Sequence, residues 1–390
     1  MESPLLTRAR ALHAAQPVVD TLAPNWDAEM YLAPGMADLA RKLQAEGVSR
    51  AQIQARLGEE LAARIGTDAV LREGYLAYWA RAGVTAGSTS LLFSGPPSRA
   101  WEQVQRSIDR SERILAGFDG AIVLARSADD ITAAHRRGQR TIVFNCQNAD
   151  PIGDDLDRVD ALWQRGVRIV QVTYNLRNLY GDGCLERRDG GLSRFGGALV
   201  ERLNRSRIVV DVSHSSDQTG YDAIEASDRP IAITHAAARA ISGHPRAKPD
   251  ALLRRVGETG GFVGVVAVPA IISRDGRGAT IDLMIDHLLH VMNVAGAAAV
   301  GVGTDWGKPY YQVMRWEYAT VAEAVQRGGF DWVGWLPEHH FDPNEQCEGL
   351  ETWDRWPHLT ARMLERGMDE RSVIGLIGGN FLRFWRDTTA

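Results

Sequence analysis

Six polar side chains follow separate apolar segments of the chain, and their types could bind a metal ion or transfer a proton: Asp20, Gln147, Tyr174, His214, His235 and Asp305. His214 and His235 are the strongest pair, because neutral imidazoles are good ligands for zinc and similar ions. Asp305 could accept a proton from water at such an ion and deliver it to a leaving amine. If the segments converge, these side chains predict a site for metal-assisted hydrolysis.

Each of these residues also has a simpler interpretation. Either histidine could bond a loop carbonyl, and Asp305 could be a helix cap or a loop carboxylate. Two histidines at consecutive strand ends favour the metal site over that interpretation. Glu338–His340 could also bind a metal, although adjacent histidines on a loop are usually solvated or line a pocket. Residues 213–216, Ser-His-Ser-Ser, lack the glycines of a nucleophile elbow, so a serine hydrolase is not supported.

Eight short, apolar and β-branched segments alternate with segments of helical patterning, which predicts parallel βα units of the α/β class. Eight such units with right-handed crossovers predict a (β/α)8 TIM barrel, with the active site at the carboxyl ends of the strands. The predicted strands are residues 17–20, 83–92, 140–144, 167–174, 208–214, 230–235, 262–266 and 299–305. No composition break or linker divides the chain, so one domain over residues 1–390 is predicted.

Two regions fall outside the βα repeat. Residues 30–80 contain two helical patterns, at 36–45 and 49–65, and predict a helical insertion after the first strand. Residues 306–351 predict a long irregular loop, and its aromatic residues favour an ordered pocket wall. Those aromatic residues are Tyr310, Tyr311, Trp316, Tyr318, Phe330, Trp332 and Trp335. The chain is predicted to end in helices at about 370–376 and 380–386.

The composition excludes several classes of protein. The 390 residues are 45% hydrophobic and 24% charged, which is typical of a folded globular chain. The 44 basic and 49 acidic side chains give a net charge of −5, so no basic field is available to bind nucleic acid. Three cysteines form no disulfide framework, and no apolar segment is long enough for a signal peptide or a membrane span. These features predict a cytoplasmic protein with a small-molecule substrate.

Several short motifs together resemble the membrane (renal) dipeptidase family of metallopeptidases. The likeness runs from about Val18 to Arg386, and it is densest after Val167. The motifs are Asp-Val-Ser-His at 211–214, Ile-Thr-His at 233–235, Arg-Ala-Lys-Pro-Asp at 246–250, Val-Gly-Val-Gly-Thr-Asp at 300–305 and Gly-Gly-Asn-Phe-Leu-Arg at 378–383. The resemblance implies a barrel of the metal-dependent amidohydrolase type, hydrolysis of dipeptides with two zinc ions, and a homodimer.

Carried over position by position, the resemblance makes His214 and His235 ligands of one zinc ion. It makes Arg246 the group that binds the substrate carboxylate, and Asp305 the carboxylate that handles the proton. Arg246 suits this role chemically, because a guanidinium group matches a free carboxylate in a bidentate manner.

The sequence departs from the family pattern at the other zinc ion. Leu22 and Pro24 stand where the family has a His-x-Asp pair of ligands. Gln147 aligns with the glutamate that bridges the two ions, and Tyr174 aligns with a histidine that polarises the substrate. Asp27 is a candidate substitute ligand from a shifted loop.

These departures favour a site with one zinc ion bound by His214, His235 and Gln147. Tyr174 would contact the substrate and donate a hydrogen bond to the developing oxyanion, while the ion polarises water or a carbonyl group. The leading hypothesis is a metal-dependent hydrolase of a dipeptide or a similar small amide with a free carboxylate. A hydrolase or lyase of another small carboxylate, a non-catalytic protein that binds an amino-acid-like ligand, and a two-metal site with residues 20–27 misaligned are the alternatives.

Overall fold

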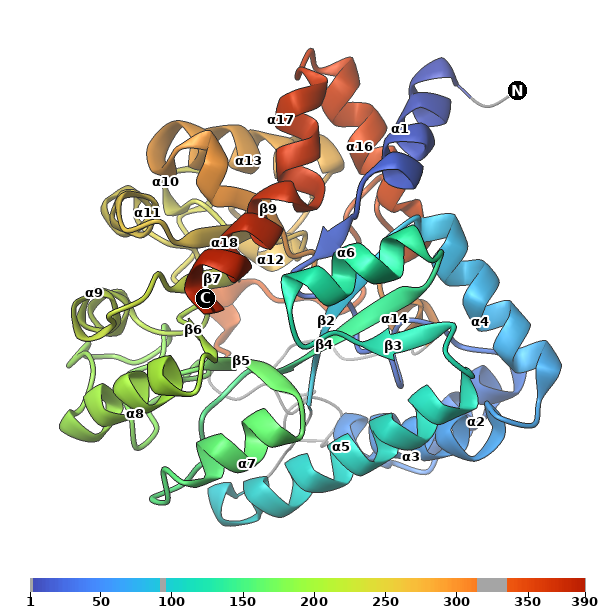
Figure 1. Ribbon diagram of the computed structural model, residues 1–390, viewed down its shortest axis with the longest axis horizontal. Coiled ribbons are helices and arrows are strands. Elements are labelled where there is room, and N and C mark those ends of the chain that lie inside the picture. Colours follow the sequence, from blue (N-terminus) through green and yellow to red (C-terminus); the bar gives the residue numbers. More distant parts are fainter. Residues whose placement is uncertain (1–2, 92–95, 314–334, 390) are drawn as a thin grey trace.

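Parallel β-strands built from the apolar segments form the centre of the structure, a computed structural model that describes residues 3–91, 96–313 and 335–389 (Figure 1). Eight of them lie side by side in the order β1-β2-β4-β5-β6-β7-β8-β9, and β3 pairs with the first half of β4. The strands are β1 Val19–Asp20, β2 Ala86–Ser90, β3 Ile122–Leu124, β4 Arg140–Cys146, β5 Val167–Gln171, β6 Val209–Asp211, β7 Ala232–Ala236, β8 Phe262–Val265 and β9 Val300–Val302. The eight strands of the continuous order are the eight predicted ones.

Backbone hydrogen bonds between the two edge strands close the sheet into a barrel. The amide of Thr21, directly after β1, donates to the carbonyl of Val302 in β9 at 2.9 Å. The amide of Asp305 donates to the carbonyl of Leu22 at 2.8 Å. Because all strand pairs are parallel, closure brings every carboxyl end to the same mouth of the barrel.

Helices connect the strands and surround the barrel, as the alternating pattern predicts. They are α1 Pro4–Ala15, α2 Pro34–Ala45, α3 Arg50–Arg64, α4 Ala69–Ala82, α5 Ala100–Gly117, α6 Ala128–Arg136, α7 Arg158–Gln164, α8 Arg194–Arg205, α9 Asp217–Ala226, α10 Arg239–Ser242, α11 Asp250–Glu258, α12 Pro269–Ile272, α13 Ile281–Ala295, α14 Pro309–Val313, α16 Trp356–Glu365, α17 Glu370–Ile374 and α18 Asn380–Thr389. None of the described helices is both long and apolar enough to span a bilayer.

The helical insertion after β1 consists of α2, α3 and α4. Helix α3 begins with a capping box, in which Ser49 accepts from the backbone of Gln52 and the Gln52 side chain bonds back to Ser49. Helix α4 ends at Gly83, whose φ of 64° lies in the left-handed region that glycine adopts without strain. The sequence pattern located α2 and α3 within two residues at each end, and α4 was not predicted separately.

Helix α18 covers the amino ends of the strands. Its apolar residues Phe381, Phe384 and Trp385 form one buried cluster with residues from the barrel strands, including Val19 and Phe262. In Figure 1 the C-terminal helix, drawn in red, crosses in front of the strands near the centre of the view. With that end filled by side chains, the mouth at the carboxyl ends of the strands is left for a ligand.

The loop after β9 contributes buried aromatic side chains. Trp306 and Tyr310 are fully buried, and Trp335 packs on Phe341 with ring centroids 5.1 Å apart. Trp316, Tyr318, Phe330 and Trp332 lie outside the described residues.

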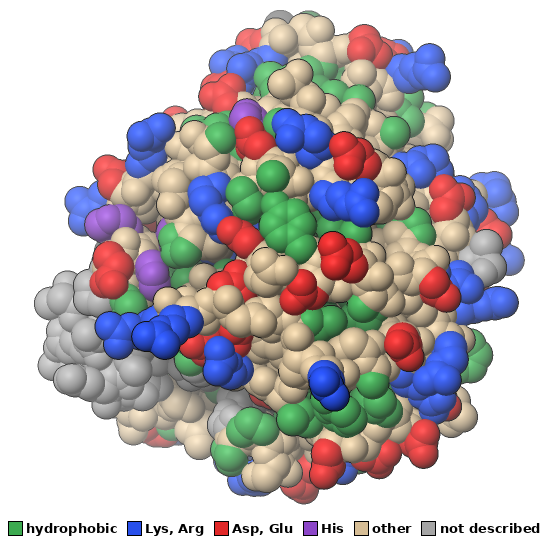
Figure 2. All heavy atoms as spheres, turned by 90° about the vertical axis from the view of Figure 1, so that its left-hand side faces the viewer, with side chains coloured by type: hydrophobic (Ala, Val, Ile, Leu, Met, Phe, Trp, Pro, Cys, Tyr) green, Lys and Arg blue, Asp and Glu red, His purple; other side chains and the backbone are tan. Residues whose placement is uncertain are grey.

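The charged side chains are mixed over the surface. Figure 2 shows one face on which basic and acidic side chains lie interspersed, without a continuous field of either sign. This face agrees with the near balance of 44 basic and 49 acidic residues. It offers no extended basic surface to a phosphate backbone.

Asp20 does not line the mouth, contrary to its place among the strand-end candidates. Its carboxylate is fully buried and accepts hydrogen bonds from the Thr304 amide at 2.9 Å and the Thr304 hydroxyl at 2.6 Å. The indole nitrogens of Trp353 and Trp356 also donate to it, at 2.8 and 3.1 Å. Burial raises the pKa of Asp20 to about 6, and these donors oppose the shift. Asp20 therefore ties β1 to β9 and to the helix that begins at Trp356.

Asp20→Asn should destabilise the protein by about 2–3 kcal/mol, because its amide group would place a donor against one of the buried donors. Urea unfolding at neutral pH measures this change. Asp38→Asn is the matched control, since that side chain is 72% exposed and should change stability by less than about 0.5 kcal/mol. Equal stability of both variants would contradict a structural role for Asp20.

Candidate metal and substrate site

Two histidines face each other at the carboxyl ends of neighbouring strands. His214 lies three residues beyond β6, and His235 lies within β7. Their Nε2 atoms are 2.9 Å apart, and both side chains are buried. The structure brings these two side chains together, as the strand order predicts.

The partners of the Nδ1 atoms determine which nitrogen of each ring carries the proton. His214 Nδ1 lies 2.7 Å from Asn175 Oδ1, which can only accept, so this Nδ1 is the protonated nitrogen. His235 Nδ1 lies 2.9 Å from the hydroxyl of Thr234, whose own proton goes to Asp211. Both Nε2 atoms are therefore acceptors with free lone pairs.

Two lone pairs aimed at one another repel unless a cation lies between them, so this donor set fits one metal ion. Neutral imidazole nitrogens of this kind are common zinc ligands, and His214 and His235 would hold the ion through Nε2. Burial, and next the charge of Arg246, hold the pKa of His214 and of His235 well below the usual value, so both rings stay neutral. Within the described residues, no third His, Cys, Asp or Glu joins them in a metal-sized group.

Tyr174 covers the histidine pair. It lies three residues beyond β5, and its ring stacks on His214 with centroids 4.1 Å apart. Burial and then the charge of Asp305 raise the pKa of Tyr174, so its hydroxyl stays protonated and can donate a hydrogen bond. The next residue, Asn175, sets the tautomer of His214. One loop therefore supplies both the stacking ring and the hydrogen-bond acceptor for this histidine.

Arg246 is a fully buried cation attached to the same pair. One Nη donates to the carbonyl oxygen of His235 at 2.7 Å. The Nε and the other Nη are buried and have no hydrogen-bond partner among the described residues. A buried donor without an acceptor lowers the stability of the folded protein, and a charged donor lowers it more. The guanidinium group therefore has donors available for an anionic ligand beside His235.

Asp305 takes part in a second group of charges at the mouth. It lies three residues beyond β9 with φ of 48°, a conformation that few residues other than glycine adopt. Its Oδ1 lies 3.1 Å from the ammonium group of Lys308, which is also 3.4 Å from Glu29 Oε2. Arg50 donates to the other oxygen of Glu29 at 2.9 Å. Asp305 is therefore paired with a buried lysine.

The remaining candidate ligands have other partners. The amide nitrogen of Gln147, one residue beyond β4, donates to Ser90 at the end of β2, and no hydrogen bond within the described residues joins Gln147 to either histidine. Asp27 is buried and accepts from Arg110 Nε at 2.8 Å, so it does not substitute for the ligands that are absent at positions 22 and 24. His339 packs against His244 with ring centroids 5.6 Å apart, away from any metal-sized group of described residues.

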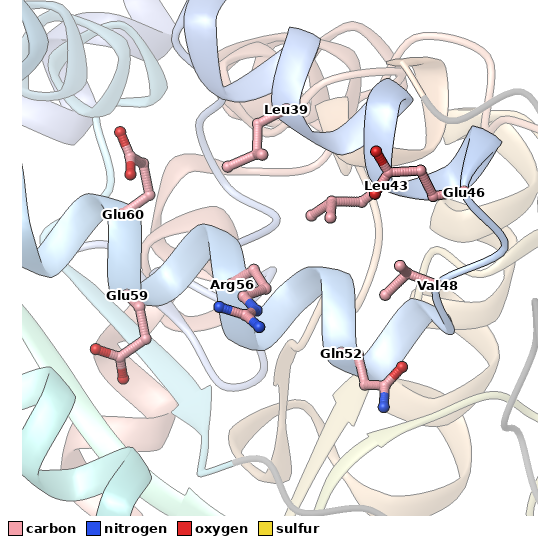
Figure 3. A pocket seen from close by; sticks show the side chains of 8 residues that line it. All are labelled: Leu39, Leu43, Glu46, Val48, Gln52, Arg56, Glu59 and Glu60. Atoms are coloured by element: carbon pink, nitrogen blue, oxygen red, sulfur yellow. The ribbon is translucent and has the colours of Figure 1, made fainter.

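A pocket lies between helices α2 and α3 of the insertion (Figure 3). In Figure 3, Leu39 and Leu43 extend from α2 toward the facing helix α3, which carries Arg56. It is lined by Leu39, Leu43, Glu46, Val48, Gln52, Arg56, Glu59 and Glu60. None of the strand-end residues lines it, so it is separate from the histidine site.

Residues 6–319 match the model of a protein family described as membrane dipeptidase, peptidase family M19. The chain belongs to this family. It is 27% identical over 284 residues to dipeptidase tcpJ of Claviceps purpurea, which covers 72% of this chain and 59% of that protein. It is 31% identical over 289 residues to an uncharacterized dipeptidase of Schizosaccharomyces pombe. This match covers 73% of this chain and 62% of that protein. The chain thus spans less than two thirds of the length of either relative.

Solved structures share the fold of this dipeptidase-family protein. An amidohydrolase from Pseudomonas aeruginosa is 27% identical, with a TM-score of 0.73 over 98% of this chain and 99% of that one. A metallopeptidase from Rhodobacter sphaeroides, liganded with a phosphinate mimic of L-Ala-D-Ala, is 19% identical, with a TM-score of 0.69 over 96% and 99%. The predicted family and the predicted amidohydrolase-type barrel are therefore confirmed.

Sequence reasoning missed the residues that support the site of this dipeptidase-family protein. Asn175 and Thr234, which fix the histidine tautomers, each stand next to a predicted site residue in the chain. Lys308 follows Asp305 by three positions, a spacing that could have indicated a local ion pair. Glu29 and Arg50 lie in or near the insertion, and no pattern in the sequence connects them to Asp305.

Thr234→Val should weaken metal binding by about 10- to 100-fold, because it removes the group that orients His235 through Nδ1. Competition with a chromophoric chelator measures the affinity, and circular dichroism checks the fold. Thr67→Val, at an exposed position, is the control. A folded Thr234→Val variant with unchanged metal affinity would contradict the assigned tautomer.

Proposed function

We propose that this protein is a metal-dependent hydrolase of dipeptides or similar small amides that carry a free carboxylate. The observation that carries the proposal is Arg246, a buried guanidinium bonded to the backbone of the metal-ligand candidate His235. Two of its nitrogens have no partner among the residues that the structure describes. Such a group selects a planar anion, and a carboxylate bound there would place the adjacent amide bond near the histidine pair. Membership of the dipeptidase family and the dipeptidase names of its relatives support this substrate class.

His214 and His235 would hold one metal ion, for which we propose zinc, and the side-chain oxygen of Gln147 would complete the protein ligands. The bound ion supplies Lewis acidity at the scissile amide. Because both Nδ1 protons are already used by Asn175 and by Thr234, the two Nε2 lone pairs are directed to one point before the ion arrives. Such preorganisation favours affinity, since neither ring needs a change of tautomer.

Tyr174 and Asp305 would handle the charge and the proton of the reaction. The neutral hydroxyl of Tyr174 donates a hydrogen bond to the oxygen that becomes negative when the amide carbon is attacked. Asp305 accepts a proton from the attacking water and delivers it to the leaving amine. Arg246 keeps the substrate oriented through both steps.

Arg246→Met should lower kcat/KM for a dipeptide by about 10²- to 10³-fold, because the carboxylate loses two charge-assisted hydrogen bonds. Rates with a dipeptide and with its C-terminal amide measure the effect, and the preference for the free acid should disappear. Arg41→Met, at an exposed side chain, should leave both rates unchanged. Retention of the free-acid preference by Arg246→Met would assign carboxylate binding to another group.

Elemental analysis of the purified protein should find close to one zinc ion per chain, and His214→Ala should bind none. Removal of the ion with a chelator should abolish hydrolysis, and zinc should restore it. A content near two ions, or none, in the wild-type protein would contradict the single-ion site.

We also propose a homodimer and a cytoplasmic location, which rest on the family resemblance and on the composition. Light scattering at several protein concentrations tests the first of these. Neither is needed for the catalytic roles assigned above.

A further inference from the structure

Two carboxylates from different loops share one buried ammonium group at the mouth. Glu29 is 3% exposed and Lys308 is 5% exposed, and Lys308 Nζ lies 3.1 Å from Asp305 and 3.4 Å from Glu29. Carboxylates that converge on one point repel each other unless a cation lies between them. Lys308 supplies that cation from the chain itself.

The group lies at the seam where the barrel closes. The amide of Asp305 bonds the carbonyl of Leu22, so the loop after β9 runs beside the loop after β1. At this seam β1 is followed by Leu22 and Pro24, both buried, which offer no ligand atom in their side chains. The ammonium group contacts both carboxylates, and the side chains at positions 22 and 24 add no ligand atom to the group.

Lys308 and Glu29 are both charged. Burial lowers the pKa of Lys308, but the charges of Asp305 and Glu29 outweigh burial, and the net shift is upward. Burial raises the pKa of Glu29, but Lys308 and Arg50 outweigh it, and the net shift is downward. Lys308 already compensates the charges of Glu29 and Asp305, and Arg50 adds to this at Glu29, so a divalent ion placed there would gain less.

Lys308 also restricts the carboxylate of Asp305. Its ammonium group donates a hydrogen bond to Oδ1 at 3.1 Å. The Asp305 side chain is 17% exposed, which leaves it accessible from the mouth. A lysine three residues away thus holds one oxygen of the Asp305 carboxylate.

We propose that Lys308 is a built-in cation that takes the place of a second metal ion between Glu29 and Asp305, and that it positions Asp305 for proton transfer. The first part stands on the geometry alone, whereas the positioning role rests on the function proposed above. Lys308 is then the residue that limits the protein to one ion.

The test compares the number of bound metal ions in the wild-type protein and in Lys308→Met, which keeps the side-chain length and removes the charge. Manganese is the probe, because it prefers carboxylate oxygens. Lys308→Met should bind one more Mn²⁺ per chain than the wild type, and millimolar Mn²⁺ should raise its melting temperature by several degrees more. Equilibrium dialysis with elemental analysis gives the count.

Two further variants keep the test decisive. Lys308→Arg retains the charge and should bind the same number of ions as the wild type, whereas Glu29→Gln combined with Lys308→Met should lose the additional ion. If Lys308→Met folds only with Mn²⁺, the proposal is supported. If it stays unfolded in Mn²⁺, or folds with the wild-type count, the proposal is wrong.

The count also separates this proposal from the proposed function. A wild-type protein without any metal would overturn the hydrolase proposal, yet a gain of one ion in Lys308→Met would still support the built-in cation. A wild type with one ion and no gain in the variant would overturn only the role of Lys308.

Discussion

The site depends on two imidazole lone pairs that face each other at 2.9 Å. Asn175 on one side and the Thr234–Asp211 pair on the other use the remaining ring protons, and burial keeps the rings uncharged. A cation is the group that makes this arrangement attractive. Two other mouth residues contact the same pair, because Tyr174 stacks on His214 and Arg246 bonds the backbone of His235.

The barrel makes this arrangement possible by closing between its first and last strands. Asp20 contributes directly, since it accepts hydrogen bonds from Thr304 next to β9 and from Trp353 and Trp356 near the C-terminus. Helix α18 fills the opposite end with aromatic side chains. Aromatic packing therefore closes the amino ends of the strands, while the Asp20 network and the candidate site share the carboxyl ends.

The sequence predicted the barrel and the histidine pair because both depend on local patterns. Apolar β-branched runs mark buried parallel strands, and the carboxyl ends of such runs meet at the mouth. The pattern missed β3, which has only three residues, and it misplaced Asp20, whose two-residue strand leaves the direction of the side chain undetermined. The pairing of Glu29 with Lys308 depends on the paths of two loops, which periodicity does not encode.

The two buried cations at the mouth, Lys308 and Arg246, differ in whether a carboxylate of the chain pairs with them. Lys308 is neutralised within the chain, because Glu29 and Asp305 are both within 4 Å of its ammonium group. Arg246 is equally buried, yet its described hydrogen bond goes to a neutral carbonyl and two of its nitrogens have no described partner. A buried charge without a counterion is destabilising until an anion arrives. In a protein with net charge −5 and mixed surface charges, that local imbalance is what would direct a substrate carboxylate to Arg246 instead of Lys308.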